Sequence, residues 1–567
     1  MYAPNLKTLI DPESSPMHDV LVWFHADEQG LSRRYPIVFS PAACQAFAIF
    51  YDEWGAELDA IAFDDLSVAG RVDFHLLKQR ISKGRRWRNQ EQRRYEESKA
   101  WLPFAEAVIE LEERRLAIEP VDPETAAGHL NDACKATKTV LETLMASGKN
   151  AGLDPAAANA VVGCAGTLKA QIENWFKERN GYDPLVSWWV ENPYRELIDT
   201  LDAYVKVLKT EVLGEKEGSI PPIASAPLGR AFIVSALRDE AIAYSPEALI
   251  DIAEQELTWC EAEADRAAAE LGYSENRAGA IEHIKTLHVQ PGEQPYQGRA
   301  LAEEAVAFLD DNGLISIPEH ARRIWRQTMI PPETQASYPF LWGGETMGMS
   351  FAHSAMSHTQ KLSSMRSNNI PFLRATVHHE LIPGHHLQMY KQARCNVHRH
   401  GYGTAFCGEG WPLYWELLLF EMGFPKTPAD RLGFLFWRLH RCARVMVVLG
   451  FHIGRYTISD CLDLVIGRVG HELEGGTSQV RWLTGGGPEP LYGAAYMLGG
   501  LQLRALRREL VDGGVMTERA FHDAVLEANS MPIELLRALL TRTPPARDDK
   551  PAWHFYRKQT DESTAGH

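Results

Sequence analysis

Four histidines and one glutamate crowd the eleven residues from His378 to Gln388, which read His-His-Glu-Leu-Ile-Pro-Gly-His-His-Leu-Gln. Histidine is a mediocre helix former with no general value on a solvated surface, so we interpret this stretch as a site of chemical function. Neutral imidazoles bind Zn²⁺, and a glutamate directly after the first ligand can take a proton from metal-bound water. We therefore predict that His379 is a metal ligand and that Glu380 is a general base.

The spacing leaves two candidates for the second histidine ligand. In the usual H-E-x-x-H helix the histidines stand four residues apart on one face, but the residue four after His379 is Pro383. His385 comes two positions late, and a local bulge at Pro383 and Gly384 would bring it back beside His379. His386 is the alternative, because residues seven apart also share a face of an unbroken helix. We favour His385.

A third ligand is expected because catalytic zinc sites usually keep three protein ligands and one open position. The best source is residues 408–416, Gly-Glu-Gly-Trp-Pro-Leu-Tyr-Trp-Glu. Pro412 is accepted in a first helical turn, so Glu409 is expected at the start of a helix that folds back onto the histidines. Glu416, two turns later on the same side, is predicted to hold an imidazole N–H. The alternative role for Glu409 is to complement the helix dipole.

These two segments resemble the family known as domain of unknown function 885, a group of proposed metallopeptidases that is similar to the gluzincin peptidases. The resemblance implies an elongated, mainly α multi-helix fold with a deep central cleft and a small β-hairpin or sheet beside the zinc helix. It also implies one zinc per chain and hydrolysis of a peptide or amide bond. Three further residues of the segments are assigned to substrate binding or ligand support: His386, Tyr414 and Glu416.

The same resemblance assigns roles further along the chain. Tyr496 matches a late tyrosine that donates a hydrogen bond to a developing oxyanion, and Tyr492 lies one turn earlier on the same face. His452 matches a position near the cleft and is a candidate to assist Tyr496. Arg481 matches an arginine that would grip a substrate carboxylate through its planar guanidinium group.

Short strands are predicted on either side of Gly343-Gly344. The resemblance makes residues 348–351, beginning at Gly348, an edge strand that holds an extended substrate by strand addition. A purely structural hairpin is the alternative. The chain departs from the family pattern at Pro412, at Val448 and at residues 490–493, which leaves the predicted metal ligands intact.

Length and composition exclude several classes of protein. The 567 residues carry a net charge of −17 and a pI near 5.7, which argues against nucleic acid or an anionic membrane as a partner. The eight cysteines form no C-x-x-C pair, which favours a reducing compartment. No basic region followed by an apolar run opens the chain. We therefore expect a cytoplasmic protein without a nucleic-acid or membrane partner. The sequence leaves the oligomeric state open, with a homodimer as one option.

Helical periodicity dominates the chain, and the Pro-rich residues 218–222 interrupt it. We predict an N-terminal helical lobe at residues 1–217. A metal-binding catalytic lobe at residues 218–567 would contain the HHELIPGHH helix, the GEGWPLYWE helix and the C-terminal helices. Residues 432–448 read as a buried helix with a polar stripe formed by Arg438, His440, Arg441 and Arg444.

The combined prediction is a zinc-dependent hydrolase in which His379, His385 and Glu409 hold the metal and Glu380 transfers the proton. Mn²⁺, Co²⁺ or Ni²⁺ would also suit such ligands. Two alternatives stay open: an amide hydrolase that acts on a small non-peptide metabolite, and a catalytically silent helical binding protein. Glu380 argues against the silent protein, because a structural site has no need of a base.

Overall fold

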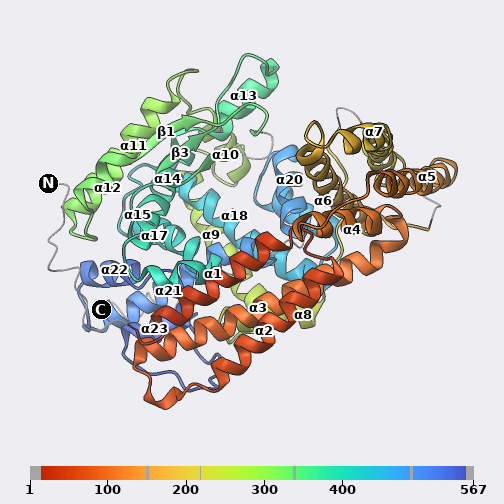
Figure 1. Cartoon of the computed structure of the whole chain (residues 1–567). Helices are drawn as coiled ribbons and strands as arrows, with labels where there is room; N and C mark the ends of the chain where they lie inside the picture. Colours follow the sequence, from red (N-terminus) through yellow and green to blue (C-terminus); the bar gives the residue numbers. More distant parts are fainter. Residues whose placement is uncertain (1–14, 149–151, 217–218, 336–339, 486–488, 557–567) are drawn as a thin grey trace. The chain divides into compact units, whose positions relative to one another are not determined.

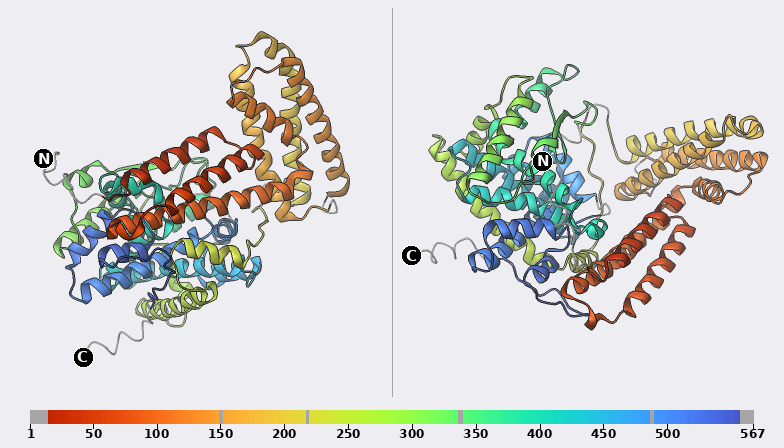
Figure 2. Two further views of the ribbon diagram at one scale, coloured as in Figure 1. Left: turned by 60° about the horizontal axis from the view of Figure 1, so that its bottom comes forward. Right: turned by 60° about the vertical axis from the view of Figure 1, so that its left-hand side comes forward.

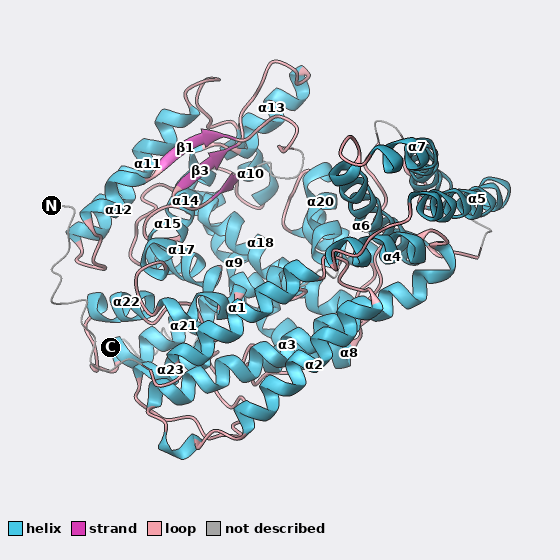
Figure 3. Ribbon diagram, in the orientation of Figure 1, coloured by secondary structure: helices cyan, strands magenta, loops and turns pink. Residues whose placement is uncertain are grey.

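The chain folds almost entirely into α-helices, as the computed structural model shows for residues 15–148, 152–216, 219–335, 340–485 and 489–556 (Figure 3). Within these residues the strands are β1 (Arg326–Met329), β2 (Leu341–Trp342) and β3 (Thr346–Met349). The predicted class, mainly α with a small sheet, is confirmed. The finer likeness to a gluzincin fold stays a prediction.

Two compact units divide the chain. One comprises residues 1–22, 62–80 and 227–567, and the other comprises residues 23–61 and 81–226. Every predicted site residue belongs to the first of these units. The predicted lobe boundary falls at residues 217 and 218, which lie outside the described residues.

The unit of residues 23–61 and 81–226 is built from helices whose starts the sequence encodes locally. Asp122, Asp154 and Asp183 each precede a proline and accept hydrogen bonds from backbone N–H groups of the first turn. The helices α5, α6 and α7 lie side by side (Figure 2). Its helices are α2 (Pro41–Asp59), α4 (Ala105–Leu116), α5 (Pro123–Ser147), α6 (Pro155–Arg179) and α7 (Pro184–Val207), with parts of α1 (His18–Arg34) and α3 (Val68–Ser98).

The other unit is organised around α18 (Pro428–His452), whose residues from Leu432 to His452 are all buried. This helix packs against α9, α14, α20 and α21 (Figure 1). None of the described helices combines the length and the apolar run that a membrane span requires. The remaining helices of this unit are α8 (Arg230–Asp239), α9 (Pro246–Glu270), α10 (Arg277–Lys285), α11 (Gln294–Asp311), α12 (Glu319–Ile324), α13 (His358–Ser367), α14 (Ile370–Glu380), α15 (His385–Gln392), α16 (Ala405–Gly408), α17 (Gly410–Glu421), α19 (Ile458–Leu462), α20 (Leu473–Thr484), α21 (Tyr492–Arg507), α22 (Glu518–Glu527) and α23 (Ile533–Leu540).

The small sheet has the strand order β1-β3-β2, with β1 parallel and β2 antiparallel to β3. Met347 and Met349 point from β3 into a cluster with Leu373 and Val377 of α14. Gly348 pairs with β1 on one side and with β2 on the other. The expectation that an edge strand begins at Gly348 is therefore wrong, because both sides of β3 are already hydrogen-bonded there.

Candidate metal centre

A helix break, not a bulge, absorbs the two extra residues of the histidine motif. The helix α14 ends at Glu380, and α15 begins at His385 after a four-residue link. A side chain at Gly384 would collide with the carbonyl oxygen of His379, so only glycine allows this reversal. The indole of Trp411 donates a hydrogen bond of 2.8 Å to the carbonyl of Pro383 and holds the link in place.

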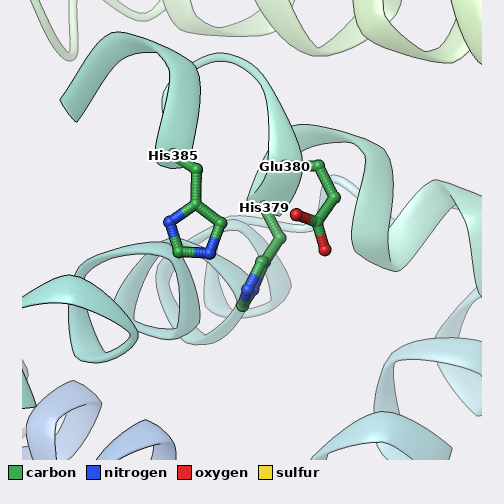
Figure 4. Close-up of side chains that lie close together, drawn as sticks. All are labelled: His379, Glu380 and His385. Atoms are coloured by element: carbon green, nitrogen blue, oxygen red, sulfur yellow. The ribbon is translucent and has the colours of Figure 1, made fainter. Parts of the chain in front are cut away.

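This break brings His379, Glu380 and His385 together from two consecutive helices (Figure 4). One ligand atom from each residue lies within 4.8 Å of the others. Burial would lower the pKa of His379, but the neighbouring carboxylates of Glu409 and Glu416 outweigh burial and raise it to about 9. A positive charge is therefore favoured at this position, which suits a bound cation.

Glu409 completes the cluster from the junction of α16 and α17. Its Oε2 atom lies 3.2 Å from His385 Nε2 and 3.7 Å from His379 Nε2. Ligand bonds of about 2.0–2.1 Å in a tetrahedral zinc site separate the ligand atoms by about 3.3 Å. Within the described residues this buried oxygen forms no hydrogen bond of good geometry, although both imidazoles lie within ion-pair distance of it. An orphaned carboxylate oxygen that faces two imidazole nitrogens fits a divalent cation.

Glu416 fixes the orientation of His379. The Nδ1–H of His379 donates to Glu416 Oε1 over 2.6 Å, which leaves Nε2 directed toward Glu409. Arg441 lies 3.6 Å from the same Glu416 oxygen. Burial alone would raise the pKa of Glu416, but the His379 hydrogen bond and the Arg441 charge lower it below its usual value. The carboxylate therefore stays ionised and can support the imidazole.

Two tyrosines of α21 border the cluster. The Tyr492 hydroxyl donates to the other oxygen of Glu409, and the Tyr496 ring lies 6.1 Å from the His379 ring at a 15° angle. Burial raises the pKa of both tyrosines above the usual value, so both hydroxyl groups keep their protons. They are hydrogen-bond donors at neutral pH.

Glycines let α21 approach close enough to place these tyrosines. A Cβ atom at Gly410 would lie 2.6 Å from the Gly499 backbone, and one at Gly499 would collide with the Phe406 carbonyl. The backbones of α16, α17 and α21 therefore touch directly. This contact sets Glu409 beside Tyr492.

Two predicted residues point elsewhere. His386 donates from Nε2 to the carbonyl of Ala321 over 2.8 Å, so His385 and not His386 joins the cluster. The Tyr414 hydroxyl donates to His522 Nε2 over 2.6 Å, because Nδ1 of that histidine donates to the Leu314 carbonyl. Tyr414 thus joins α17 to α22 and does not line the metal cluster.

His452 and Arg481 are not part of the cluster formed by His379, Glu380 and His385. His452 is buried at the end of α18, eleven residues or roughly 16 Å along the helix axis beyond Arg441. Arg481 lies on α20 between Gln479 and Trp482, which both contact Arg444. Their catalytic and substrate-binding roles stay predictions.

Arg441 and Arg444 are the residues of this region to which the sequence assigned no role. Both flank the Tyr496 ring. Their spacing could have indicated a functional role, because arginines three residues apart in an otherwise apolar helix share one face. Charged groups inside an apolar run are expensive to bury, which makes them candidates for function.

A pocket of about 710 Å³ lies between α11 and the segment from α12 to β1. It reaches the metal region through Leu381 and Ile382 of the α14–α15 link. None of the three candidate ligands lines it. The pocket therefore lies beside the candidate metal site but is not lined by its candidate ligands.

The fold and this cluster define a mainly helical protein with a candidate metal centre. The family described as "Bacterial protein of unknown function (DUF885)" matches residues 25–540, and the chain belongs to this family. The family resemblance based on the two motifs is confirmed. The metallopeptidase activity that the resemblance implies is not shown by this match.

Two solved structures share the fold at 15% sequence identity. One protein, from Shewanella oneidensis, is provisionally described as a lipoprotein of unknown function; the TM-score is 0.67, and the match covers 92% of this chain and 98% of that chain. The other, from Colwellia psychrerythraea, is provisionally described as a lipoprotein, with a TM-score of 0.58 and the same coverage. At this identity the likeness shows the fold alone. A comparison with curated proteins found no match.

The expected cytoplasmic location is corrected by these neighbours. Both are described as lipoproteins, which contradicts the location that we predicted from the N-terminal sequence and the cysteine spacing. Those features were weak indicators, because a globular chain needs the same core and similar surface composition on either side of a membrane.

Proposed function

We propose that this protein is a zinc-dependent hydrolase that cleaves a peptide or amide bond. The observation that carries the proposal is the orphaned Glu409 oxygen facing the Nε2 atoms of His379 and His385, with Glu380 beside them. Structural zinc sites are usually closed by four protein ligands, whereas three ligands leave one position for water or substrate. A carboxylate next to that open position is needed for catalysis and not for structure.

In the proposed reaction each residue has a separate role. A zinc ion held by His379, His385 and Glu409 would supply Lewis acidity and a water of lowered pKa. The Glu380 carboxylate takes the proton from the attacking water as the new C–O bond forms. The same proton then passes from Glu380 to the amine nitrogen as the C–N bond breaks. Tyr496, which keeps its phenolic proton, would donate to the carbonyl oxygen as negative charge develops there.

The backbone around Glu380 supports this role. Any side chain at Gly343 would collide with the Glu380 carboxylate, and the N–H of Gly344 donates to the Glu380 carbonyl over 3.2 Å. The β2–β3 turn therefore lies directly against the base and limits the positions its side chain can take. Restricting a general base in this way lowers the entropy cost of reaching the reacting geometry.

Metal analysis and one substitution test the proposal. Protein purified without chelator should contain about one zinc per chain, and His379→Ala should contain none. Glu380→Gln should keep its zinc and lose about 10²–10⁴-fold in kcat, since it retains shape but cannot accept the proton. A screen of short peptides beside non-peptide amides would give the substrate class.

Two outcomes would contradict the proposal. Wild-type turnover by Glu380→Gln would remove the general base. No zinc in the wild type, with none taken up on addition, would favour the silent binding protein. Activity confined to non-peptide amides would instead select the metabolite hydrolase.

A further inference from the structure

Two buried arginines stand next to the metal centre. Arg441 and Arg444 on α18 are 6% and 8% exposed. Their guanidinium carbons lie 4.5 and 4.9 Å from the Tyr496 ring, which itself lies 6.1 Å from the His379 ring. Both positive charges therefore lie against the same aromatic ring that stacks near a candidate metal ligand.

These charges are poorly compensated. Arg444 donates from Nη2 to the neutral amide of Gln479 over 2.7 Å, while its buried Nε and Nη1 have no hydrogen-bond partner among the described residues. Arg441 faces Glu416 at 3.6 Å, but that oxygen already accepts from His379, and Nε of Arg441 has no described partner. Buried donors are rarely left without acceptors, so these groups call for an acceptor from outside the chain.

Other buried arginines of the same unit each have a carboxylate as ionic partner. Each of them forms an ion pair of 2.5–2.7 Å with a carboxylate: Arg438 with Glu256, Arg399 with Asp73 and Arg504 with Glu421. Arg438 lies on α18 only two turns before Arg444. In the part of the chain that the structure describes, Arg444 forms no such pair. Its position is therefore an exception to the pattern of the unit.

The electrostatics of Arg444 agree with a missing anion. Burial and the like charge of Arg441 lower the pKa of Arg444 to about 10, against smaller raising effects of Tyr496 and Glu409. The group still carries its charge at neutral pH, but the protein does not stabilise that charge. A bound anion would reverse this shift.

The charge balance of the centre points the same way. With a divalent ion held there, the carboxylates of Glu380, Glu409 and Glu416 and the guanidinium groups of Arg441 and Arg444 leave one net positive charge. A region of one sign with low-dielectric walls attracts a ligand of the opposite sign. One negative charge on the substrate would neutralise the assembly.

We propose that Arg441 and Arg444 bind a carboxylate of the substrate, so that the hydrolase selects peptides or amides with a negative charge close to the cleaved bond. This inference rests on the proposed function and names its substrate class. The planar guanidinium fork matches a carboxylate through two parallel hydrogen bonds. From the His379 ring through Tyr496 to either guanidinium carbon the path is at most about 11 Å, the length of about three residues of extended chain.

Calorimetric binding tests the inference without turnover. The probes are N-benzoylglycine and N-benzoylglycinamide, which differ only in a carboxylate and a carboxamide, and the protein is zinc-loaded Glu380→Gln. The carboxylate should bind at least about tenfold more tightly than the amide. Adding Arg444→Gln should remove this preference, and Arg444→Lys should restore part of it. Arg455→Gln, which removes a charge from the half-exposed residue three positions after His452, is the matched control and should preserve the preference.

Stability separates a binding role from a structural role. Because Arg444 is buried without an ionic partner among the described residues, Arg444→Gln should leave the melting temperature unchanged or raise it. A marked fall in melting temperature, with the carboxylate preference intact in Arg444→Lys and in any folded Arg444→Gln protein, would overturn the inference. Equal binding of both probes to Glu380→Gln would overturn it without any arginine variant.

Peptides identify the source of the carboxylate. One pair is an acetylated tri-alanine with a free or amidated C-terminus, and a third peptide is amidated but carries an internal glutamate. Preference for the free C-terminus assigns the main-chain carboxylate, and preference for the glutamate peptide assigns a side chain. Turnover of all three at one rate would refute the inference and keep the hydrolase. Carboxylate-selective binding without zinc or turnover would refute the hydrolase and keep the anion site.

Discussion

At the scale of single residues, the candidate metal centre depends on which nitrogen of each histidine already forms a hydrogen bond. Nδ1 of His379 donates to Glu416, so Nε2 is directed at Glu409. Nε2 of His386 donates to Ala321, which removes that ring from the cluster. His385 and His386 are neighbours of the same type, yet only His385 has its ring beside Glu409. The difference comes from the helix restart at residue 385.

Glu416 is expected to strengthen zinc binding through its hydrogen bond with His379. Glu416→Gln should weaken zinc binding by about 10–100-fold, because the amide holds the His379 N–H less strongly and adds no charge to the imidazole. Competition with a chromophoric chelator measures this affinity. Glu421→Gln, on the same helix but paired with Arg504, is the control and should bind zinc like the wild type. Equal affinity in Glu416→Gln and the wild type would refute the supporting role.

At the scale of secondary-structure elements, contacts between backbones position the side chains of the candidate site. The break between α14 and α15 requires Gly384, and the approach of α21 to α16 and α17 requires Gly499 and Gly410. Neither requirement follows from helix propensity, since glycine weakens a helix by about 1 kcal/mol relative to alanine. These glycines are explained only by what lies opposite them.

Gly499→Ala tests this packing. The added methyl group meets the Phe406 carbonyl, which is backbone and cannot rotate away, so α21 must move. The free energy of unfolding should fall by about 1–3 kcal/mol, and zinc affinity should fall with it because Tyr492 leaves Glu409. Urea unfolding and chelator competition measure the two effects.

Gly408→Ala is the matched control for that substitution. Gly408 lies in α16, and a Cβ atom there would meet nothing within 4 Å. Alanine should therefore leave stability unchanged or raise it slightly through its better helix propensity. If both variants lost stability equally, the contact between Gly499 and Phe406 would not explain the loss, because Gly408 has no such contact.

At the scale of the whole molecule, a buried ion cluster ties together segments that are distant in sequence. Asp73 accepts from Arg399 Nε over 2.7 Å and faces His398 Nε2 at 3.1 Å, and Arg399 also donates to the carbonyl of Ala528. Burial would raise the pKa of Asp73, but the hydrogen bond from His398 and the charge of Arg399 lower it below the usual value. The ionised form is therefore favoured by folding.

This lowered pKa predicts how stability changes with pH. The contribution of Asp73 is fully present above its usual pKa of about 3.9 and is lost as the pH falls through the lower value in the folded protein. Asp73→Asn should lower the unfolding free energy by about 3–5 kcal/mol at pH 7, because Arg399 is left buried and unpaired. The difference from the wild type should shrink below about pH 4.

Chemical unfolding at several pH values measures this dependence. Asp64→Asn, at an exposed carboxylate 3.7 Å from Arg71, is the control and should change stability little at any pH. A constant difference between Asp73→Asn and the wild type from pH 7 to pH 3 would show that the charge of Asp73 is not what stabilises the cluster.

The helical class and much of the candidate site could be predicted from the sequence alone. Hydrophobic periodicity and Asp-Pro helix starts act within a few residues, so both can be recognised without a fold. His379, Glu380, Glu409 and Glu416 could be proposed because their types and spacing have chemical meaning along a helix. The family followed from the same motifs and was confirmed over residues 25–540.

The remaining features depend on how distant segments pack and could be seen in the tertiary structure alone. It selected His385 over His386, moved Gly348 from a sheet edge to the central strand and turned Tyr414 toward His522. The cytoplasmic location predicted from the N-terminal sequence and the cysteine spacing was wrong, because these features do not determine where a folded chain is delivered. Whether a buried arginine has a carboxylate partner depends on helices far away in the sequence. Arg438 pairs with Glu256 of α9, whereas Arg444 donates to the amide of Gln479 and lies over the ring of Tyr496, beside the candidate metal ligands. Local rules act along a few turns of helix, but the environment of a side chain is set by the segments that fold against it.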